Sequence, residues 1–184
     1  EIKIYRRMSG GGAVYHDFGN INYTFIGEHT RNALGADFLK PIVDVLSNEL
    51  NVPVNIGQRK DLWLAGYKIS GTAAHISRGR QLHHGTLLYD AKIENLLKSL
   101  SPERRDLVQK ATASVPSPVK NIRDYLISRD GSAPYKDDFY DLFSLKMLAY
   151  YGASKFLTLT DQEIDGITLL QKDKYTQRSW NYRK

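Results

Sequence analysis

Three consecutive glycines, Gly10 to Gly12, follow closely on Arg6 and Arg7 and constrain this chain more than any other feature of its sequence. Glycine loses more backbone entropy on folding than other residues, so a glycine run is retained where φ is positive or where a ligand must approach the main chain. Main-chain N–H groups exposed in such a loop can bind a phosphate or a carboxylate, and nearby arginines add affinity for an anion. A tight turn with solvated arginines is the alternative interpretation. The arginine pair and the following His16-Asp17 favour the anion-binding loop.

The apolar pattern predicts an α+β fold with a mostly antiparallel sheet. Alternating apolar residues predict strands at 2–7, 13–16, 21–25, 61–64, 67–70, 81–89 and 155–159, and the segments 61–64 and 67–70 pair as a hairpin around Ala65-Gly66. Helical spacing predicts helices at 36–50, 92–100, 119–127, 139–151 and 161–174. The polar, proline-containing segment 102–118 is expected to be a surface loop.

The length of 184 residues suits one domain with a sizeable core and is too short for two ordinary ones. Hydrophobic residues make up 41% of the chain and glycine adds 14 residues, which is typical of a globular protein. No apolar run approaches the roughly 20 residues of a membrane span, and the first residues do not form a signal peptide. We therefore expect a soluble domain without a membrane partner. Because the chain starts at Glu1 with a strand-like segment, we also expect that an upstream part is missing.

The residue types exclude several kinds of chemistry. No cysteine is present, which excludes disulfides, thiolate metal sites and a cysteine nucleophile. The five histidines lack the spacing of zinc ligands, and the adjacent His83 and His84 would point to opposite faces of a strand. The 26 lysines and arginines against 20 aspartates and glutamates give a net charge of +6, which favours a nucleic acid, a nucleotide or an acidic protein as partner. The 12 tyrosines and 6 phenylalanines are not interleaved with basic residues, which argues against a nucleic-acid binder.

Two further segments are candidates for a binding site. In the segment 66–73, Lys68 lies on a predicted strand and small residues follow it, so the strand could hold a positive charge at a fixed point beside room for a ligand. The alternative, a surface lysine before a Ser-Gly turn, is favoured by this segment alone. The segment 83–88 is a candidate because its histidines could line a binding site, and the alternative is a strand histidine packed into the sheet. Neither segment decides the function by itself.

The order and spacing of these segments indicate a function, because together they resemble the lipoate-protein ligase A family. The resemblance extends over nearly the whole chain. It is carried by RRMSGGGAVYHDFGNINYTF at 6–25, the aspartate of RKDL at Asp61, GYKISGTA at 66–73, HHGTLL at 83–88, ATASVPSPVKNI at 111–122, and Tyr175 with Trp180-Asn181-Tyr182 near the end.

The resemblance implies a fold related to biotin ligases and class II aminoacyl-tRNA synthetases, with helices flanking the antiparallel sheet. Residues 1–184 would be a single catalytic domain that lacks its N-terminal strands and has no small C-terminal domain. The implied reaction has two steps. Lipoate and MgATP give lipoyl-adenylate and pyrophosphate, and a lysine of an acceptor then displaces AMP to form an amide. The implied acceptors are the lipoyl domains of 2-oxoacid dehydrogenase E2 subunits or the glycine-cleavage H protein, and the implied location is the cytoplasm.

The resemblance also implies roles for individual residues. Lys68 matches the catalytic lysine that bridges the lipoate carboxylate and the phosphate, and Asp61 is the candidate magnesium ligand. The segment 101–117 corresponds to the one that closes over the adenylate. The implied lipoate-binding residues are Arg7, Ser9, Gly10, Gly11, Gly12, His16, Asn20 and Lys68. The implied nucleotide-binding residues are Arg7, Gly12, Ala13, Val14, Tyr15, Asp61, Lys68, Ser70, Gly71, Ala73, His84 and Thr86.

The chain departs from the family pattern at three points. Part of the expected lipoate pocket lies in the N-terminal strands that are absent here, and Lys60 stands where the family commonly has asparagine. Some relatives without the small C-terminal domain depend on a separate accessory protein for adenylation. A lipoyltransferase that uses preformed lipoyl-AMP, or a catalytic subunit that needs an accessory protein, therefore remains an alternative to the complete ligase.

Other functions fit the sequence less well. An octanoyltransferase of the same superfamily passes the acyl group through a cysteine, and the chain has none. A biotin ligase would carry a different arginine-glycine loop from the one at 6–12. A folded module without catalytic activity is a further possibility.

Overall fold

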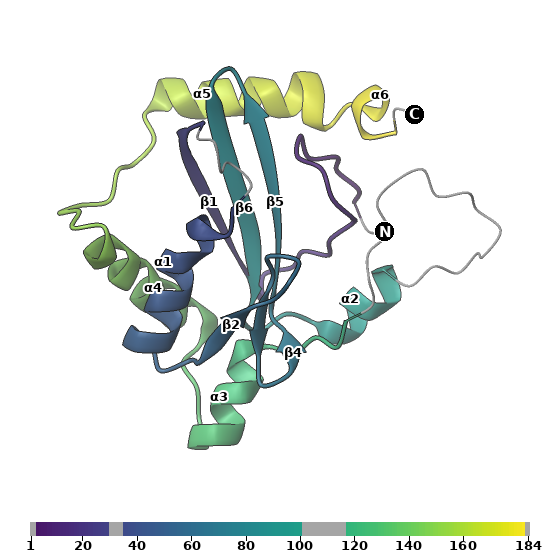
Figure 1. Ribbon diagram of the computed structural model, residues 1–184. Coiled ribbons are helices and arrows are strands. Elements are labelled where there is room, and N and C mark those ends of the chain that lie inside the picture. Colours follow the sequence, from purple (N-terminus) through teal and green to yellow (C-terminus); the bar gives the residue numbers. More distant parts are fainter. Residues whose placement is uncertain (1–2, 30–34, 101–116, 183–184) are drawn as a thin grey trace.

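The computed structural model describes residues 3–29, 35–100 and 117–182 and has an α+β fold built on two antiparallel sheets (Figure 1). The larger sheet has the strand order β1-β6-β5, and the smaller sheet has the order β2-β3-β4. The predicted fold class, a mostly antiparallel sheet flanked by helices, is confirmed. The strands are β1 (Asn20–Glu28), β2 (Val54–Ile56), β3 (Leu62–Leu64), β4 (Tyr67–Lys68), β5 (Ser70–Ser77) and β6 (Arg80–Leu88).

Two tight turns fix the register of the sheets. Ala65 and Gly66 both have positive φ and connect β3 to β4, as the sequence predicts. Arg78 and Gly79 also have positive φ and connect β5 to β6. Two successive residues with positive φ form the turn whose twist matches that of antiparallel strands, so both pairs of strands continue as hairpins.

The helices differ from the predicted ones mainly at their ends. The predicted helix at 36–50 is one helical segment whose hydrogen-bonding pattern changes from 3₁₀ to α to π along its length. Gly131, with a φ of 80°, ends α3, and a capping box between Thr160 and Glu163 begins α5. None of the helices in the described ranges is long and apolar enough to cross a membrane. The helical elements are η1 (Asp37–Leu39), α1 (Lys40–Asp44), η2 (Val45–Glu49), α2 (Ile93–Leu100), α3 (Ile122–Asp130), α4 (Lys136–Tyr150), α5 (Asp161–Leu170), η3 (Gln171–Tyr175) and α6 (Arg178–Asn181).

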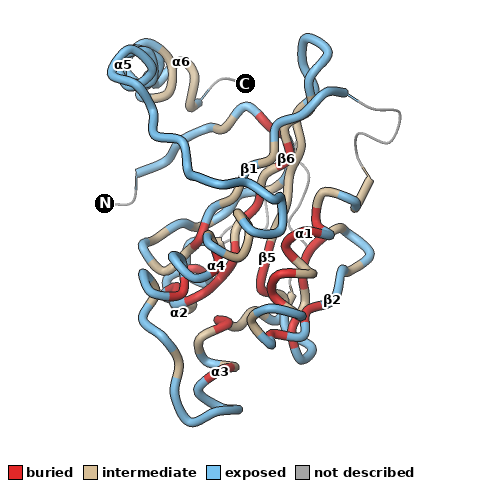
Figure 2. The backbone as a smooth tube through the Cα atoms, turned by 90° about the vertical axis from the view of Figure 1, so that its left-hand side faces the viewer, coloured by how far each residue is buried: buried red, intermediate tan, exposed pale blue. Residues whose placement is uncertain are grey.

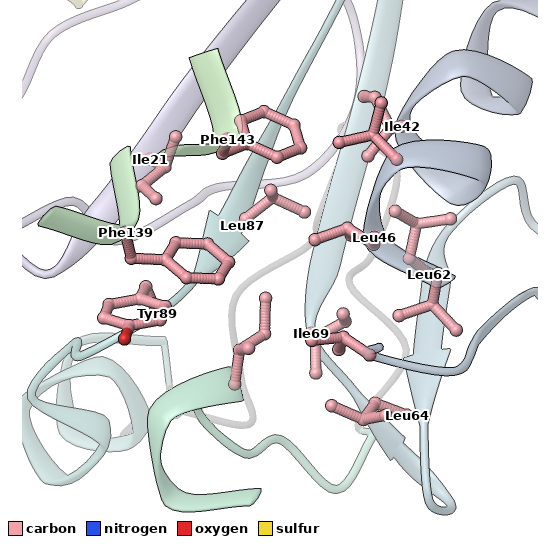
Figure 3. Close-up of a cluster of buried hydrophobic side chains, with 14 of the residues drawn as sticks. Ile21, Ile42, Leu46, Leu62, Leu64, Ile69, Leu87, Tyr89, Phe139 and Phe143 are labelled. Atoms are coloured by element: carbon pink, nitrogen blue, oxygen red, sulfur yellow. The ribbon is translucent and has the colours of Figure 1, made fainter. Parts of the chain in front are cut away.

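The core lies between one face of the larger sheet and the helices α1, α3 and α4 (Figure 3). Leu46 of η2, Ile69 and Leu87 are fully buried there. The ring of Tyr89 stacks on Phe139 of α4 at a centroid distance of 4.1 Å, and its hydroxyl donates to the carbonyl of Pro134. Figure 2 shows the contrast with α5 and α6, which contain no buried residue. The opposite face of the larger sheet looks toward the N-terminal segment (Figure 1).

Three predicted strands are wrong. The described residues of 2–7, the segment 13–16 and the segment 155–159 are not strands, because no neighbouring strand supplies a hydrogen-bonding partner to any of them. The alternative interpretation of the segment 66–73, a Ser-Gly turn after Lys68, does not hold either, because the small residues there begin β5, a strand that was not predicted beyond Ser70 and that pairs with β6 over its whole length. The sequence patterns also did not predict β2 and α6. Most of the predicted loop at 102–118 lies outside the described residues.

Candidate functional site

A cavity of about 450 Å³ lies between the glycine run and the face of the larger sheet that is turned away from the helical core. Its volume is within the range of about 300–1,000 Å³ that is usual for small-molecule sites. One wall is formed by residues 11–14, and the opposite wall is the sheet. The charged residues that line it are Arg7, Arg59, Asp61 and Lys68.

Six of the sheet residues that line the cavity lie at alternate positions of three strands. Asn22 of β1 lies opposite Thr86 of β6, and Thr86 lies opposite Gly71 of β5. Two residues further along, His84 lies between Thr24 and Ala73. Because side chains alternate between the faces of a strand, these residues share one face.

His83 and His84 lie on opposite faces of β6, as predicted. The ring of His83 stacks on Phe38 at a centroid distance of 3.9 Å on the core side, whereas His84 lines the cavity. His83 is therefore the histidine that packs into the sheet, and His84 is the one that lies at the candidate site.

Arg7 holds the glycine run in shape. Its Nη2 donates to the carbonyls of Gly10 (2.6 Å) and Gly12 (2.9 Å), and its Nε donates to the Oγ of Ser9 (3.0 Å). Gly11 has a φ of 96°, and a Cβ on it would lie 2.9 Å from the Nη2 of Arg7. The backbone conformation thus favours glycine, and a side chain here would also have to displace the guanidinium from its hydrogen bonds.

Ser9 connects this loop to the sheet. Its Oγ lies 2.5 Å from the Nε2 of His84, and Ser9 itself is buried. Burial lowers the pKa of His84, and the positive charge of Arg7 lowers it further. Burial and Arg7 also lower the pKa of His16, although a hydrogen bond with the Asn22 side chain opposes this shift. Both shifts favour the neutral imidazole, and Arg7 contributes a positive charge on this side of the cavity.

Lys68 and Asp61 form an ion pair at the end of the cavity near the smaller sheet. The Nζ of Lys68 lies 3.1 Å from the Oδ2 of Asp61, and the indole of Trp63 donates to the Oδ1 at 2.9 Å. Burial by itself would raise the pKa of Asp61, but the hydrogen bond from Trp63 and the ammonium of Lys68 outweigh it and hold the pKa below its usual value. The backbone N–H of Lys68 donates to the carbonyl of Pro118. Lys68 is therefore fixed at both its main chain and its charged end.

The residues around Asp61 offer little to a metal ion on their own. Over the described ranges, no group of three or more His, Cys, Asp or Glu side chains lies close enough together to hold a metal, and Asp61 is the only carboxylate among the lining residues. A magnesium ion commonly takes one or two protein carboxylates and completes its coordination with water and substrate phosphates. The donor set fits a magnesium ion carried by a nucleotide and does not fit a metal bound by the protein alone.

The structure brings most of the predicted site residues to the cavity wall. Five predicted site residues are not part of that wall: Ser9, Gly10, Tyr15, Asn20 and Ser70. Ser9 and Gly10 accept hydrogen bonds from Arg7, which does line the cavity. The side chain of Asn20 donates to the carbonyl of Tyr15. Ser70 is buried, and its Oγ lies 3.4 Å from the hydroxyl of Tyr23, so these residues support the wall from outside. The predicted residues that line the cavity are Arg7, Gly11, Gly12, Ala13, Val14, His16, Asp61, Lys68, Gly71, Ala73, His84 and Thr86.

Sequence reasoning missed six lining residues: Asn22, Tyr23, Thr24, Arg59, Thr72 and Gly85. The alternation of polar and apolar residues in the segment 20–25 could have indicated Asn22 and Thr24, because the flanking apolar residues Ile21 and Phe25 pack in or against the core. Gly85 could not be predicted from its neighbours in sequence, because its constraint comes from β1. A Cβ on Gly85 would lie 2.3 Å from the hydroxyl of Tyr23, whose pKa burial raises to about 12.

Comparison with protein families gives a match over residues 1–137 to the lipoyl protein ligase A/B catalytic domain. Among curated proteins, the chain is 30% identical over 184 residues to lipoate-protein ligase LplJ of Bacillus subtilis, a match that covers 98% of this chain and 54% of that protein. It is 32% identical over 183 residues to lipoate–protein ligase 1 of Staphylococcus aureus, with the same coverage. The chain thus spans about half the length of these curated relatives.

Solved structures with a similar fold include lipoate-protein ligase A bound with ATP. That structure has a TM-score of 0.76 at 22% identity, and the match covers 98% of this chain and 72% of that one. A putative lipoate protein ligase from Thermoplasma acidophilum with bound lipoic acid has a TM-score of 0.70 at 20% identity, over 97% of this chain and 70% of that one. A structure of the bipartite lipoate protein ligase from the same organism has a TM-score of 0.72 at 20% identity, over 97% and 69%. At this level of identity the likeness establishes a common fold.

Proposed function

Because the chain belongs to the lipoyl protein ligase A/B catalytic domain family, we propose that residues 1–184 are the catalytic domain of an ATP-dependent lipoate-protein ligase. The protein activates lipoate with ATP to lipoyl-AMP and transfers the lipoyl group to a lysine of an acceptor protein. The ATP-bound and lipoate-bound structures with the same fold support both substrates.

The observation that carries this proposal is the excess of positive charge in one small cavity. Its described lining residues include the cations Arg7, Arg59 and Lys68 against the single carboxylate of Asp61. The first step of the reaction brings a carboxylate against the α-phosphate, and both groups are anions. Two negative charges at contact distance repel strongly where little water screens them, so a site for this step needs fixed cations.

In the first step, a carboxylate oxygen of lipoate attacks the α-phosphorus, and the bond from that phosphorus to the bridging oxygen breaks to release pyrophosphate. Lys68 is suited to hold the two anions together because β4 fixes its main chain and Asp61 orients its ammonium. Arg59 is exposed, and its side chain has no ion pair with any described residue, so its charge is available to the outer phosphates. Residues 11–14 form the wall opposite the sheet, and we expect the substrates to lie along it.

In the second step, the uncharged amine of an acceptor lysine attacks the acyl carbon of lipoyl-AMP. The bond from that carbon to the phosphate oxygen breaks, AMP leaves, and the amine loses a proton as the amide forms. We propose lipoyl domains of 2-oxoacid dehydrogenase E2 subunits or the glycine-cleavage H protein as acceptors and the cytoplasm as the location. The bipartite ligase of similar fold, which was solved as part of a lipoylation system with an E2 lipoyl domain, supports the first acceptor class.

Magnesium would accompany the nucleotide, and Asp61 is the residue that would provide it with a protein oxygen. When bound, the ion would neutralise charge on the phosphates and so favour the departure of pyrophosphate. Trp63 and Lys68 keep the Asp61 carboxylate ionised and in place for this contact.

Lipoate-dependent exchange between ATP and pyrophosphate in the full-length protein, without an acceptor, tests the proposal. Exchange by the protein alone would support a ligase that needs no other protein. Absence of exchange, together with transfer from supplied lipoyl-AMP to a lipoyl domain, would identify a lipoyltransferase or a catalytic subunit that needs an accessory protein. Absence of both activities would refute the proposed function.

A further inference from the structure

The main chain of Arg6 is held by residues from the other end of the chain. The N–H of Arg6 donates to the Oδ1 of Asn181 at 2.8 Å, and the indole N–H of Trp180 donates to the Arg6 carbonyl at 2.7 Å. The Nε of Arg6 also donates to the carbonyl of Asn181 at 3.2 Å. These partners are 174 and 175 positions away in sequence. We call the three residues Tyr175, Trp180 and Asn181 the C-terminal clip.

No strand holds this part of the chain in place. The described residues before β1 contain no regular secondary structure, so a sheet ladder does not fix the backbone at position 6. A backbone that lies outside a sheet keeps one conformation only if specific contacts over-determine it. Both main-chain hydrogen-bonding groups of Arg6 obtain such contacts from the clip.

The clip residues are themselves well supported. The side-chain amide of Asn181 donates to the carbonyl of Tyr175 at 2.9 Å, so its oxygen and its nitrogen serve two separate segments. The Trp180 ring packs edge-on against Tyr175, with the ammonium of Lys174 4.2 Å above it. The hydroxyl of Tyr175 also approaches the sulfur of Met8 at 3.9 Å, which gives the N-terminal segment a second point of attachment.

We infer that Trp180 and Asn181 are positioning residues for Arg7, and that through Arg7 they set the shape of the glycine run and the lipoate- and nucleotide-binding wall. Arg6 directly precedes Arg7, so a displacement of the Arg6 backbone moves the guanidinium that holds the carbonyls of Gly10 and Gly12. This inference rests on the proposed function for its kinetic consequences. The contacts that carry it are independent of that function.

The clip does not serve the hydrophobic core. Neither α5 nor α6 contributes a buried residue, and segment 153–160, which leads to them, is exposed throughout. Loss of a clip contact should therefore leave global stability unchanged. This separates a positioning role from a merely structural one, because a structural residue would lower the melting temperature together with the activity.

Two variants test the inference. Asn181→Ala removes the acceptor for the Arg6 N–H, and Trp180→Phe keeps a ring but removes the indole donor. Misplacement of a binding group by about 1 Å commonly costs about 100-fold in rate, so we expect kcat/KM for lipoate to fall by about 10- to 100-fold in each variant. Gln177→Ala is the matched control, because this side chain donates to the carbonyl of Lys172 within the C-terminal segment. It should retain wild-type activity.

Hydrogen exchange of the amides at 10–14 provides a readout that does not depend on activity. In Asn181→Ala we expect faster exchange there with an unchanged melting temperature, and in Gln177→Ala we expect no change. In a double-mutant cycle that combines Asn181→Ala with Arg7→Lys, the two losses of kcat/KM should not multiply, because both substitutions act through the same guanidinium. Multiplicative losses would overturn the route through Arg7.

The outcomes separate the two proposals. If the wild-type protein neither activates nor transfers lipoate, the proposed function fails. The hydrogen exchange of the amides at 10–14 then still tests whether the clip positions the glycine run. If the wild-type protein is active and both clip variants match it in kcat/KM and in amide exchange, the inference is refuted while the proposed function stands. A fall in melting temperature that accounts for the whole loss of activity would also overturn the positioning role.

Discussion

Replacing Lys68 by methionine gives the sharpest test of the proposed chemistry. The substitution keeps a side chain of similar length and removes the ammonium that lies 3.1 Å from the Oδ2 of Asp61. No other cation of the cavity is fixed by a carboxylate partner among the described residues. We therefore expect adenylate formation to fall, while the fold of the larger sheet is retained.

The structure sets the expected magnitudes. Removal of one fixed electrostatic stabiliser of a transition state commonly costs about 100- to 1,000-fold in rate, so Lys68→Met should lose at least that much pyrophosphate exchange. Breaking a fully buried ion pair costs about 3–5 kcal/mol. Here the Lys68 side chain is 27% exposed and Trp63 still donates to Asp61, so we expect a loss of about 1–2 kcal/mol in the free energy of unfolding after solvent screening.

A double variant separates stability from chemistry. Lys68→Met with Asp61→Asn leaves no unpaired buried charge, so its free energy of unfolding in urea should return toward that of the wild type. Its pyrophosphate exchange should stay as low as that of the single variant, or lower. Wild-type exchange in Lys68→Met would refute the role of Lys68, and an exchange rate that recovers together with stability would show that the loss came from misfolding.

Three other perturbations follow from the geometry of the site. Gly11→Val places a Cβ 2.9 Å from the Arg7 guanidinium at a φ that costs a branched residue about 1–3 kcal/mol, so lipoate binding measured by calorimetry should be lost, and wild-type affinity would contradict the role of the loop. Arg59→Ala should raise the KM for ATP by about 10-fold or more and leave the melting temperature unchanged, because a hydrogen bond to a charged group is worth about 1.5–3 kcal/mol; an unchanged KM would remove Arg59 from the phosphate site. The folded-state pKa of Asp61 is lowered, so its contribution to stability is present above its unfolded pKa of about 3.9 and is lost as the pH falls through the folded value. Urea unfolding of Asp61→Asn should accordingly show a smaller loss of stability between about pH 5 and pH 2 than the wild type, and identical profiles would disprove the shift.

The sequence by itself determined the local features of this protein. In the predicted helix at 36–50, Leu39, Ile42 and Leu46 recur at helical spacing, and all three are fully buried. The turn at Ala65-Gly66 has the positive φ angles that the hairpin required. Period-two alternation placed His83 and His84 on opposite faces of one strand. Each of these features depends on residues a few positions apart, whose geometry the backbone fixes directly.

Only the tertiary structure decided which distant segments meet. The segments 2–7 and 13–16 alternate like strands, but strand formation needs a hydrogen-bonding partner, and none of the described strands lies beside them. Instead, the residues at 180–181 hold position 6, and Arg59 reaches the cavity from a loop whose sequence gives no such signal. Spacing along a chain determines the faces of single elements. Contacts across more than 170 positions depend on how those faces pack, and no local pattern encodes that.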